Sequence, residues 1–268
     1  MTQCEFYLVN PNNNITVLVE SQFSAEVQPF VAKRLLNKEK SGEQVGFIID
    51  EKSDSFDIKI RMSGGEFCGN ACMAAAAVYL SKIKEPKQLV RVSISGCDSP
   101  VNVIIKEKDA DGYLCCVQMP KTLSIGEITA VISGKECILP IVHFKGISHI
   151  FIKEKLGRGE AETLIKNMSQ ELKTDALGLM FISEDYSSLT PLVYVPKADT
   201  LYWENSCASG TAALGEYLLK VNPDLLPITV SEPGGKLKIT NEGGICLEGK
   251  SKIEKYVRNF GILNSVEI

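Results

Sequence analysis

The first half of the chain alternates short apolar segments, typical of strands, with two longer segments of helical character. Apolar residues recur near helical spacing over residues 25–36, and residues 71–80 are mostly alanine and other helix-forming residues. The β-branched and aromatic runs predict strands at 6–9, 15–19, 45–49, 56–62, 89–94, 101–105 and 113–119.

The second half repeats this order. It predicts strands at 136–143, 149–152, 179–182 and 192–195, a helix at 160–172 and another helix that follows the Cys207 segment and ends at 219. Each half carries a cysteine at the start of an alanine-rich helix, Cys68 in the first and Cys207 in the second. After each of these helices the sequence predicts a strand, a glycine-containing turn and two more short strands.

The two cysteines lie 139 residues apart, a period too long for a solenoid. The repeat therefore predicts two similar α+β domains, residues 1–122 with Cys68 and residues 123–268 with Cys207. For the last strand of the second domain, packing on the first domain is an open alternative.

Composition and charge exclude several classes of protein. The chain has 268 residues, of which 44% are hydrophobic and 23% charged, as in ordinary globular proteins. Its net charge of −4 predicts no nucleic-acid partner. The longest apolar run, residues 74–80, is too short to span a membrane, and the N-terminus lacks the features of a signal peptide. We therefore expect a cytoplasmic protein with reduced thiols.

Nine cysteines occur, at positions 4, 68, 72, 97, 115, 116, 137, 207 and 246. Most unpaired cysteines of this kind are small buried hydrophobic residues. Cys72 lies one helical turn after Cys68, and without a second cysteine or histidine pair it predicts a core position rather than a zinc site. A cysteine hydrolase would need a histidine, and only His143 and His149 are present. That alternative leaves the second cysteine unexplained.

Cys68 and Cys207 have the positions that two-base chemistry requires. Inverting a carbon next to a carboxylate needs a base on one face and an acid on the other, and a thiolate and a thiol can fill these roles. The N-terminal end of a helix favours a negative sulfur and so pulls its pKa towards neutrality.

The backbone at these helix starts offers N–H groups to a substrate carboxylate and to the charge that spreads onto it when the α-proton leaves. The donors that we expect to bind the substrate belong to Gly69 and Asn70 in the first half and to Ala208 and Ser209 in the second.

The sequences Cys68-Gly69-Asn70 and Cys207-Ala208-Ser209-Gly210-Thr211 resemble the two cysteine motifs of the diaminopimelate epimerase-like family. The resemblance spans most of the chain. It implies an α+β fold of two pseudo-symmetric domains, each a curved, mostly antiparallel sheet around a central helix. It also implies racemisation or epimerisation of an amino acid by the two cysteines, with no cofactor and no metal.

Weaker matches suggest substrate contacts. Asn13 lies where the family has a Gly-Asn-Asp turn, and Gln44 resembles a glutamine that reaches the ligand; for both, a purely structural role in a turn is an open alternative. The segment 146–149 is similar to the family's Gly-Asn-Pro-His sequence, with Ile147 in place of its asparagine.

The main departure concerns the substrate's distal group. Diaminopimelate epimerases carry an arginine before the second cysteine that binds a second carboxylate, whereas residues 196–206 contain no arginine and only one cation, Lys197. Tyr202, Trp203 and Glu204 indicate instead a side chain that can stack and bind a carboxylate, such as an imidazole. Glu204 is the candidate for the polar contact.

We therefore predict an amino-acid racemase that acts on a small-molecule amino acid, with histidine favoured, and that is nearest to the histidine racemases of the family. The alternatives are a diaminopimelate epimerase, a phenazine-biosynthesis-type isomerase that would use a carboxylate base, and a non-catalytic amino-acid-binding protein. We expect a monomer or a homodimer.

Overall fold

The computed structural model describes residues 2–196 and 199–263. The chain divides into two compact units, one formed by Met1–Gln118 together with Glu248–Ile268 and the other by Met119–Leu247. Together they make a mixed α/β protein with a barrel-like sheet. No helix within the described residues is long and apolar enough to cross a membrane.

The first unit is built around a closed ring of strands. They follow one another as β1 (Thr2–Pro11), β2 (Thr16–Val19), β3 (Gln44–Ile49), β4 (Ile58–Met62), β5 (Leu89–Ile94), β6 (Val101–Asp109), β7 (Gly112–Gln118) and β16 (Ile245–Leu263). Antiparallel pairing of β16 with β1 closes the ring. The β2–β3 and β4–β5 pairs are parallel.

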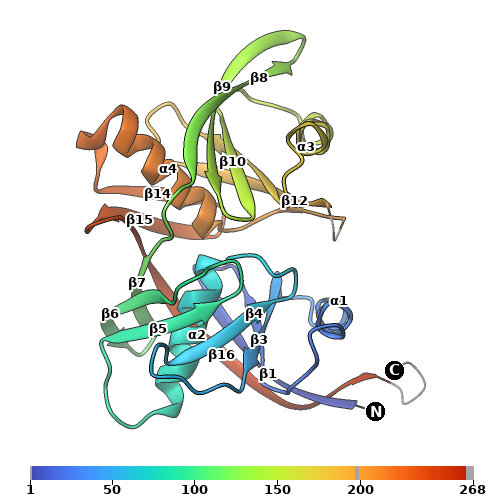
Figure 1. The fold of residues 1–268 in the computed structure, drawn as a ribbon, viewed down its shortest axis with the longest axis vertical. Coiled ribbons are helices and arrows are strands. Elements are labelled where there is room, and N and C mark those ends of the chain that lie inside the picture. Colours follow the sequence, from blue (N-terminus) through green and yellow to red (C-terminus); the bar gives the residue numbers. More distant parts are fainter. Residues whose placement is uncertain (1, 197–198, 264–268) are drawn as a thin grey trace. The chain divides into compact units, whose positions relative to one another are not determined.

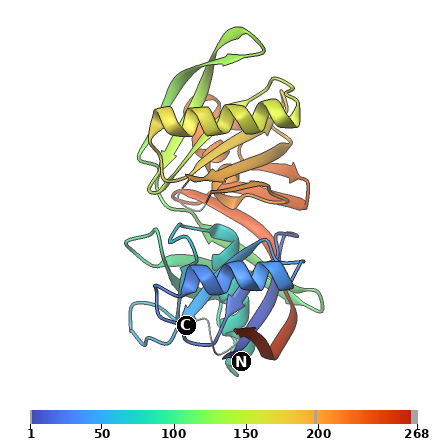
Figure 2. The same ribbon diagram turned by 90° about the vertical axis from the view of Figure 1, so that its right-hand side faces the viewer.

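Helix α2 (Gly69–Lys82) runs against six strands of this ring, β1, β2, β4, β5, β6 and β7 (Figure 1). Its first ten residues are all buried. Alanines make this possible, because their small side chains let the helix backbone approach strands on several sides. Helix α1 (Gln28–Lys38) packs through Val31, Ala32 and Leu35 on a separate apolar cluster with β2 and β3 (Figure 2).

The second unit contains a six-stranded sheet in the order β13-β12-β11-β10-β9-β8. Its strands are β8 (Ser124–Ile132), β9 (Lys135–Phe144), β10 (Ile147–Ile152), β11 (Leu177–Ile182), β12 (Leu189–Val195) and β13 (Thr200–Trp203). Only β10 and β11 are parallel among the described pairs of this sheet. Strands β14 (Ile228–Glu232) and β15 (Gly235–Asn241) form a hairpin.

Two helices pack on the strands of this unit. Helix α3 (Arg158–Leu172) buries Ala161, Ile165 and Met168 against β11 and β12, and Figure 2 shows it lying across the sheet. Helix α4 (Ala208–Val221) contacts β9, β10 and β15 and buries its first eight residues. The short 3-10 helix η2 (Pro223–Leu225) follows α4.

The helices expected from alanine content and periodicity are confirmed, with α2 and α4 extending up to two residues beyond the predicted ends. The strand predictions were incomplete. Strands β8 and β13 were not predicted, although β8 pairs with β9 along its whole length and β13 pairs with β12. The last strand, expected to be short, has 19 residues because β1 supplies a partner for most of it.

Candidate active site

Cys68 is the N-cap residue of α2 and directly precedes its first residue, Gly69. Its backbone is extended (φ −141°, ψ 113°), and its carbonyl accepts the first helical hydrogen bond, from Cys72 N–H at 3.1 Å. The Cys68 sulfur accepts a hydrogen bond from Ala71 N–H at 3.3 Å and so caps its own helix. The predicted position of this cysteine at a helix start is confirmed.

Gln44 connects Cys68 to the N-terminal strands. The Cys68 thiol donates to Gln44 Oε1 at 3.0 Å, while Gln44 Nε2 donates to Asn14 Oδ1 at 2.6 Å and to Thr16 Oγ1 at 2.8 Å. The Thr16 hydroxyl donates to the Asn14 carbonyl at 3.4 Å, so its oxygen accepts the hydrogen bond from the Gln44 amide. This pattern keeps the Gln44 oxygen turned towards Cys68.

Asn13, the candidate of the N-terminal turn, lies at an exposed position with a left-handed backbone (φ 58°). Its N–H donates to Asn10 Oδ1 at 2.7 Å, and its own Oδ1 accepts from Asn10 Nδ2 at 3.2 Å. The residue of this turn that contacts Gln44 is the buried Asn14, which sequence reasoning missed.

Cys207 begins α4 in the same way. It has an extended backbone (φ −126°, ψ 93°), and its carbonyl accepts from Thr211 N–H at 2.9 Å. Its position at a helix start is therefore also confirmed. Unlike Cys68, Cys207 is buried, and its side chain makes no capping hydrogen bond. Gly210 gives room to Met180, because a Cβ there would overlap the Met180 sulfur.

Ser209 and His149 stand behind the Cys207 sulfur. Ser209 Oγ lies 3.5 Å from Cys207 Sγ and 3.1 Å from Nε2 of the fully buried His149. Burial lowers the pKa of His149 to about 3, so this imidazole is neutral near pH 7. Ser209 was predicted as a substrate contact because of its backbone N–H. The structure shows that its hydroxyl also contacts the Cys207 sulfur and the neutral imidazole of His149.

Two carboxylates border Cys207. Glu232 accepts hydrogen bonds from the Cys207 N–H and from two neighbouring hydroxyls, and Glu204 lies in the segment before the cysteine. Burial raises the pKa of Cys207 well above its ordinary value, and Glu204 and Glu232 raise it further. The expectation that the helix start lowers the pKa is wrong for Cys207, because desolvation and the two carboxylates outweigh the helix dipole.

Trp203 and Tyr202, the two aromatic residues predicted beside Cys207, have different surroundings. Trp203 stacks on Phe181 with ring centroids 5.5 Å apart and donates from Nε1 to Glu162 of α3 at 3.0 Å. It packs against the core cluster under α3, and its place in a ligand pocket stays a prediction. Tyr202, its neighbour on β13, is half exposed. Lys197 lies outside the described residues.

Backbone donors stand where they were predicted. Gly69 and Asn70 are the first two residues of α2, and Ala208 and Ser209 the first two of α4. First-turn N–H groups have no i−4 acceptor within a helix, so these positions can bind an anion.

Three other cysteines of the first unit, Cys4, Cys72 and Cys115, are core residues. Burial raises the pKa of Cys72 well above its ordinary value and those of Cys4 and Cys115 to about 12. Within the described residues, neither Cys68 nor Cys207 belongs to a cluster of three or more potential metal ligands.

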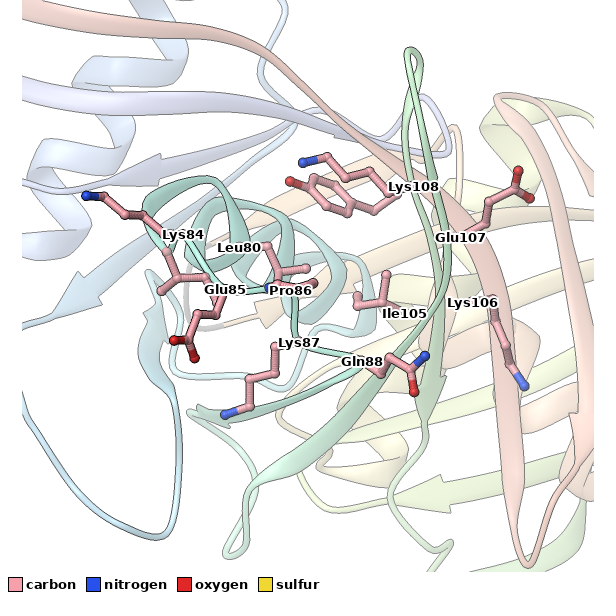
Figure 3. Close-up of a pocket in the computed structure, with 12 residues that line it drawn as sticks. Leu80, Lys84, Glu85, Pro86, Lys87, Gln88, Ile105, Lys106, Glu107 and Lys108 are labelled. Carbon is pink, nitrogen blue, oxygen red and sulfur yellow. The ribbon is translucent and has the colours of Figure 1, made fainter.

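A hollow of about 300 Å³ opens on the surface of the first unit, at the C-terminal end of α2. Leu80, Pro86 and Ile105 meet in it, and the side chains of Lys84 and Lys87 stand at its edge (Figure 3). Leu80 is twelve residues along α2 from Cys68, or about 18 Å at 1.5 Å per residue. No cysteine lines this hollow, and it is separate from the Cys68 environment.

Glu232 and Thr211 were also missed from the sequence. Thr211 stands one turn after Cys207, on the same face of α4. In β14, alternation places Val230 and Glu232 on the inner side. A carboxylate at an inward position of a strand was the available signal.

The fold is shared with known isomerases. A probable proline racemase from Agrobacterium radiobacter K84 superimposes with a TM-score of 0.71 at 10% identity, covering 98% of this chain and 94% of that one. A hydroxyproline epimerase from Agrobacterium vitis gives 0.68 at 11% identity, covering 96% and 92%. A PhzF-family phenazine biosynthesis protein from Enterococcus faecalis gives 0.59 at 12% identity, covering 97% and 100%. This is the fold of racemases, epimerases and PhzF proteins.

Sequence comparison gives the family. The family model described as "Histidine racemase CntK N-terminal domain" matches residues 3–257. The chain is 32% identical over 249 residues to a histidine racemase of Staphylococcus aureus (strain Mu50), covering 89% of this chain and 88% of that one. It is 32% identical over 269 residues to one of Fusobacterium nucleatum (strain ATCC 25586), covering 94% and 97%. The chain belongs to the histidine racemase family and is an isomerase of the racemase and epimerase class.

Proposed function

We propose that this protein interconverts L- and D-histidine with Cys68 and Cys207 as its two acid–base groups. The observation that carries the proposal is the matching position of the two thiols, each at the start of a buried, alanine-rich helix in its own unit. Relatives at 32% identity that are named histidine racemases support histidine as the substrate.

In the proposed reaction one cysteine, as thiolate, removes the α-proton, and the other, as thiol, returns a proton to the opposite face of the carbon. The S–H bond of the acid breaks as the new C–H bond forms, so the two residues exchange roles for the reverse direction. The N–H groups of Gly69, Asn70, Ala208 and Ser209 would bind the substrate carboxylate and stabilise its added charge in the transition state.

Gln44, Asn13 and Glu204 are proposed substrate contacts. The contact between Gln44 and the Cys68 thiol supports a place for this amide beside the substrate. Glu204 is close enough to Cys207 to raise the pKa of its thiol, and its carboxylate would suit the imidazole N–H of histidine. Asn13 is supported only by its place in the turn that contains Asn14.

We also propose that the two units are pseudo-symmetric copies of the diaminopimelate epimerase-like type. The support is that each unit surrounds a buried helix with strands and begins that helix at a cysteine. The nine cysteines are reduced thiols in the structure, which fits the proposed cytoplasmic location.

Deuterium uptake tests the function. In heavy water, L- and D-histidine should both lose the Cα proton signal in NMR, and circular dichroism should fall to zero from either enantiomer without added pyridoxal phosphate. A panel of other amino acids and diaminopimelate defines the substrate. Faster turnover of diaminopimelate would favour the epimerase alternative, and no exchange with any of these compounds would rule out the racemase.

A further inference from the structure

Glu232 is a buried carboxylate at the inner end of β14 whose contacts centre on Cys207. Its side chain is 8% exposed. Oε2 accepts from the Ser206 hydroxyl at 2.5 Å, and Oε1 accepts from Cys207 N–H at 3.2 Å and from the Thr211 hydroxyl at 2.7 Å. All three donors are neutral, so they solvate the carboxylate without cancelling its charge.

These contacts place a negative group at the positive end of α4. From another element, Glu232 supplies an acceptor for the N–H of Cys207, the residue directly before the helix. Burial raises the pKa of Glu232, and its three hydrogen bonds act in the opposite direction by favouring the ionised form. When ionised, Glu232 carries a full charge, which exceeds the roughly half positive charge of a helix end. The Cys207 sulfur therefore lies in a more negative environment than a helix start alone provides.

In the first unit a neutral hydroxyl follows β5, the strand that comes after that unit's own buried helix. Ser95, which directly follows β5, accepts from Met62 N–H at 2.9 Å and donates to the carbonyl of Glu66 at 2.9 Å. It ties down the segment before Cys68 as Glu232 ties down the segment around Cys207. Both units hold the segment beside the cysteine by a hydrogen bond, but in the second unit a carboxyl group makes this contact and bonds to the cysteine N–H. The carboxyl group of Glu66 in the first unit lies two residues before Cys68, and burial raises its pKa.

We propose that Glu232 is a positioning residue that holds the first turn of α4 in place and keeps Cys207 in its thiol form in the free enzyme, so that Cys207 is the acid in the direction that starts from this resting state. This inference rests on the proposed function, in which the acid must hold its proton until the α-carbon has lost its own. When Cys207 then gives up its proton to carbon, the Ser209 hydroxyl can donate to the thiolate that is left.

The charged and titratable groups that face Cys207 agree with this role. Burial, Glu204 from the preceding segment and Glu232 from β14 raise the pKa of Cys207, whereas the Ser209 hydroxyl and the Gly210 N–H lower it. His149, which reaches Ser209 from β10, is neutral because its pKa is lowered to about 3. Met180, which packs at Gly210 from β11, carries no charge.

Glu232→Gln removes the charge while keeping the shape of the side chain. Its amide oxygen can still accept from the Cys207 N–H and the Thr211 hydroxyl, and its NH2 group can donate to the Ser206 hydroxyl oxygen. The readout is the rate of Cys207 alkylation by iodoacetamide between pH 7 and 9, followed by mass spectrometry of the peptide, because only the thiolate reacts. We expect this rate to rise about tenfold, the change in thiolate fraction for one pKa unit. The Cys68 peptide is the internal reference and should react at the wild-type rate.

Two further variants separate charge from packing. Glu216→Gln removes a partly buried carboxylate from the same helix and should leave Cys207 alkylation within about twofold of wild type, because Glu216 lies more than two turns from Cys207. Glu232→Ala removes the hydrogen bonds as well, and amide hydrogen exchange at the start of α4 should then quicken. In Glu232→Gln that exchange should stay at the wild-type rate.

The inference is overturned if Glu232→Gln leaves Cys207 alkylation unchanged, or if its alkylation rises together with the same faster amide exchange as in Glu232→Ala. Alkylation is measured without turnover, so it is independent of the proposed function. If the Cys207→Ser variant still racemises histidine, the proposed function is refuted, whereas the alkylation result is unaffected. If both proposals hold, the alkaline limb of the racemisation pH profile should move to lower pH in Glu232→Gln.

Discussion

The starts of α2 and α4 have the same backbone conformation, but the side chains around the two cysteines differ. Both begin at a cysteine with extended backbone whose carbonyl accepts the first helical hydrogen bond. Cys68 is partly exposed and bonded to neutral amide groups, the Ala71 N–H and the Gln44 oxygen. Cys207 is buried among ionisable side chains, with Glu232 bonded to its N–H and His149 behind Ser209.

The difference shows that a helix start does not by itself fix the protonation of a thiol. The dipole acts over the first turn and contributes a modest energy, whereas burial and a nearby full charge can shift a pKa by several units. At Cys207 these terms raise the pKa, against the direction that the helix favours. In its resting state, a two-base enzyme built from such a pair would hold one thiol protonated.

The largest expected effect comes from replacing either cysteine, and the two variants should differ in the enantiomer whose α-proton they can still exchange. Cys68→Ser and Cys207→Ser should each lower racemisation by at least about 10³-fold, because a positioned acid or base contributes 10² to 10⁴ and serine ionises far less readily than cysteine. Each variant keeps one thiol, which can exchange the α-proton of a single enantiomer with retention.

NMR in heavy water with pure L- and D-histidine measures this exchange. The two variants should label opposite enantiomers, and this would assign a face to each cysteine. Cys72→Ser is the control, expected to remain active because Cys72 is a buried core thiol. An inactive Cys72→Ser together with an active Cys207→Ser would mean that the catalytic pair is wrong.

The second prediction concerns acid stability, which should depend on the second unit through His149. Its pKa is about 3 in the folded chain and 6.5 unfolded, so between these values the unfolded state binds the extra proton. Stability should therefore fall as pH falls below 6.5, with a contribution of about 1.4 kcal/mol per pH unit from this residue.

Urea unfolding between pH 7.5 and 4.5 measures the slope. His149→Gln should be less steep than wild type by up to this amount. His143→Gln, on β9, should keep the wild-type slope because His149 is still present. Equal slopes for wild type and His149→Gln would show that the buried imidazole is not the source of the acid sensitivity.

The sequence was a good guide where local composition decides the structure. Alanine-rich segments predicted α2 and α4 closely, and the residues before them placed Cys68 and Cys207 at the helix starts. These features depend on helix propensity and capping, which act over a few residues.

Contacts between distant segments were harder to predict. Strand β16 is long because β1 lies beside it, some 250 residues away in sequence, for example where Phe6 pairs with Val257. Trp203 packs under α3, and Glu232 reaches Cys207 across 25 residues. Nothing local marks such partners, apart from the alternation that turns Glu232 inward.

The smallest expected effect lies on the first unit's side of the comparison, at Gln44. Gln44→Leu removes the acceptor of the Cys68 thiol and the amide donor of the buried Asn14 and Thr16. Taking one partner from buried polar groups costs about 1–3 kcal/mol, so the unfolding free energy in urea should fall by this amount. Activity should fall less than in Cys68→Ser, because the base itself remains.

Gln118→Leu is the matched control in the same unit, since Gln118 accepts one hydrogen bond, from Asn102 at 3.0 Å. It should lose some stability but leave histidine turnover close to wild type. If Gln44→Leu and Gln118→Leu reduce turnover equally, Gln44 acts only in folding. If Gln44→Leu alone reduces turnover, the neutral amide network of the first unit serves Cys68 as the charged network of the second serves Cys207.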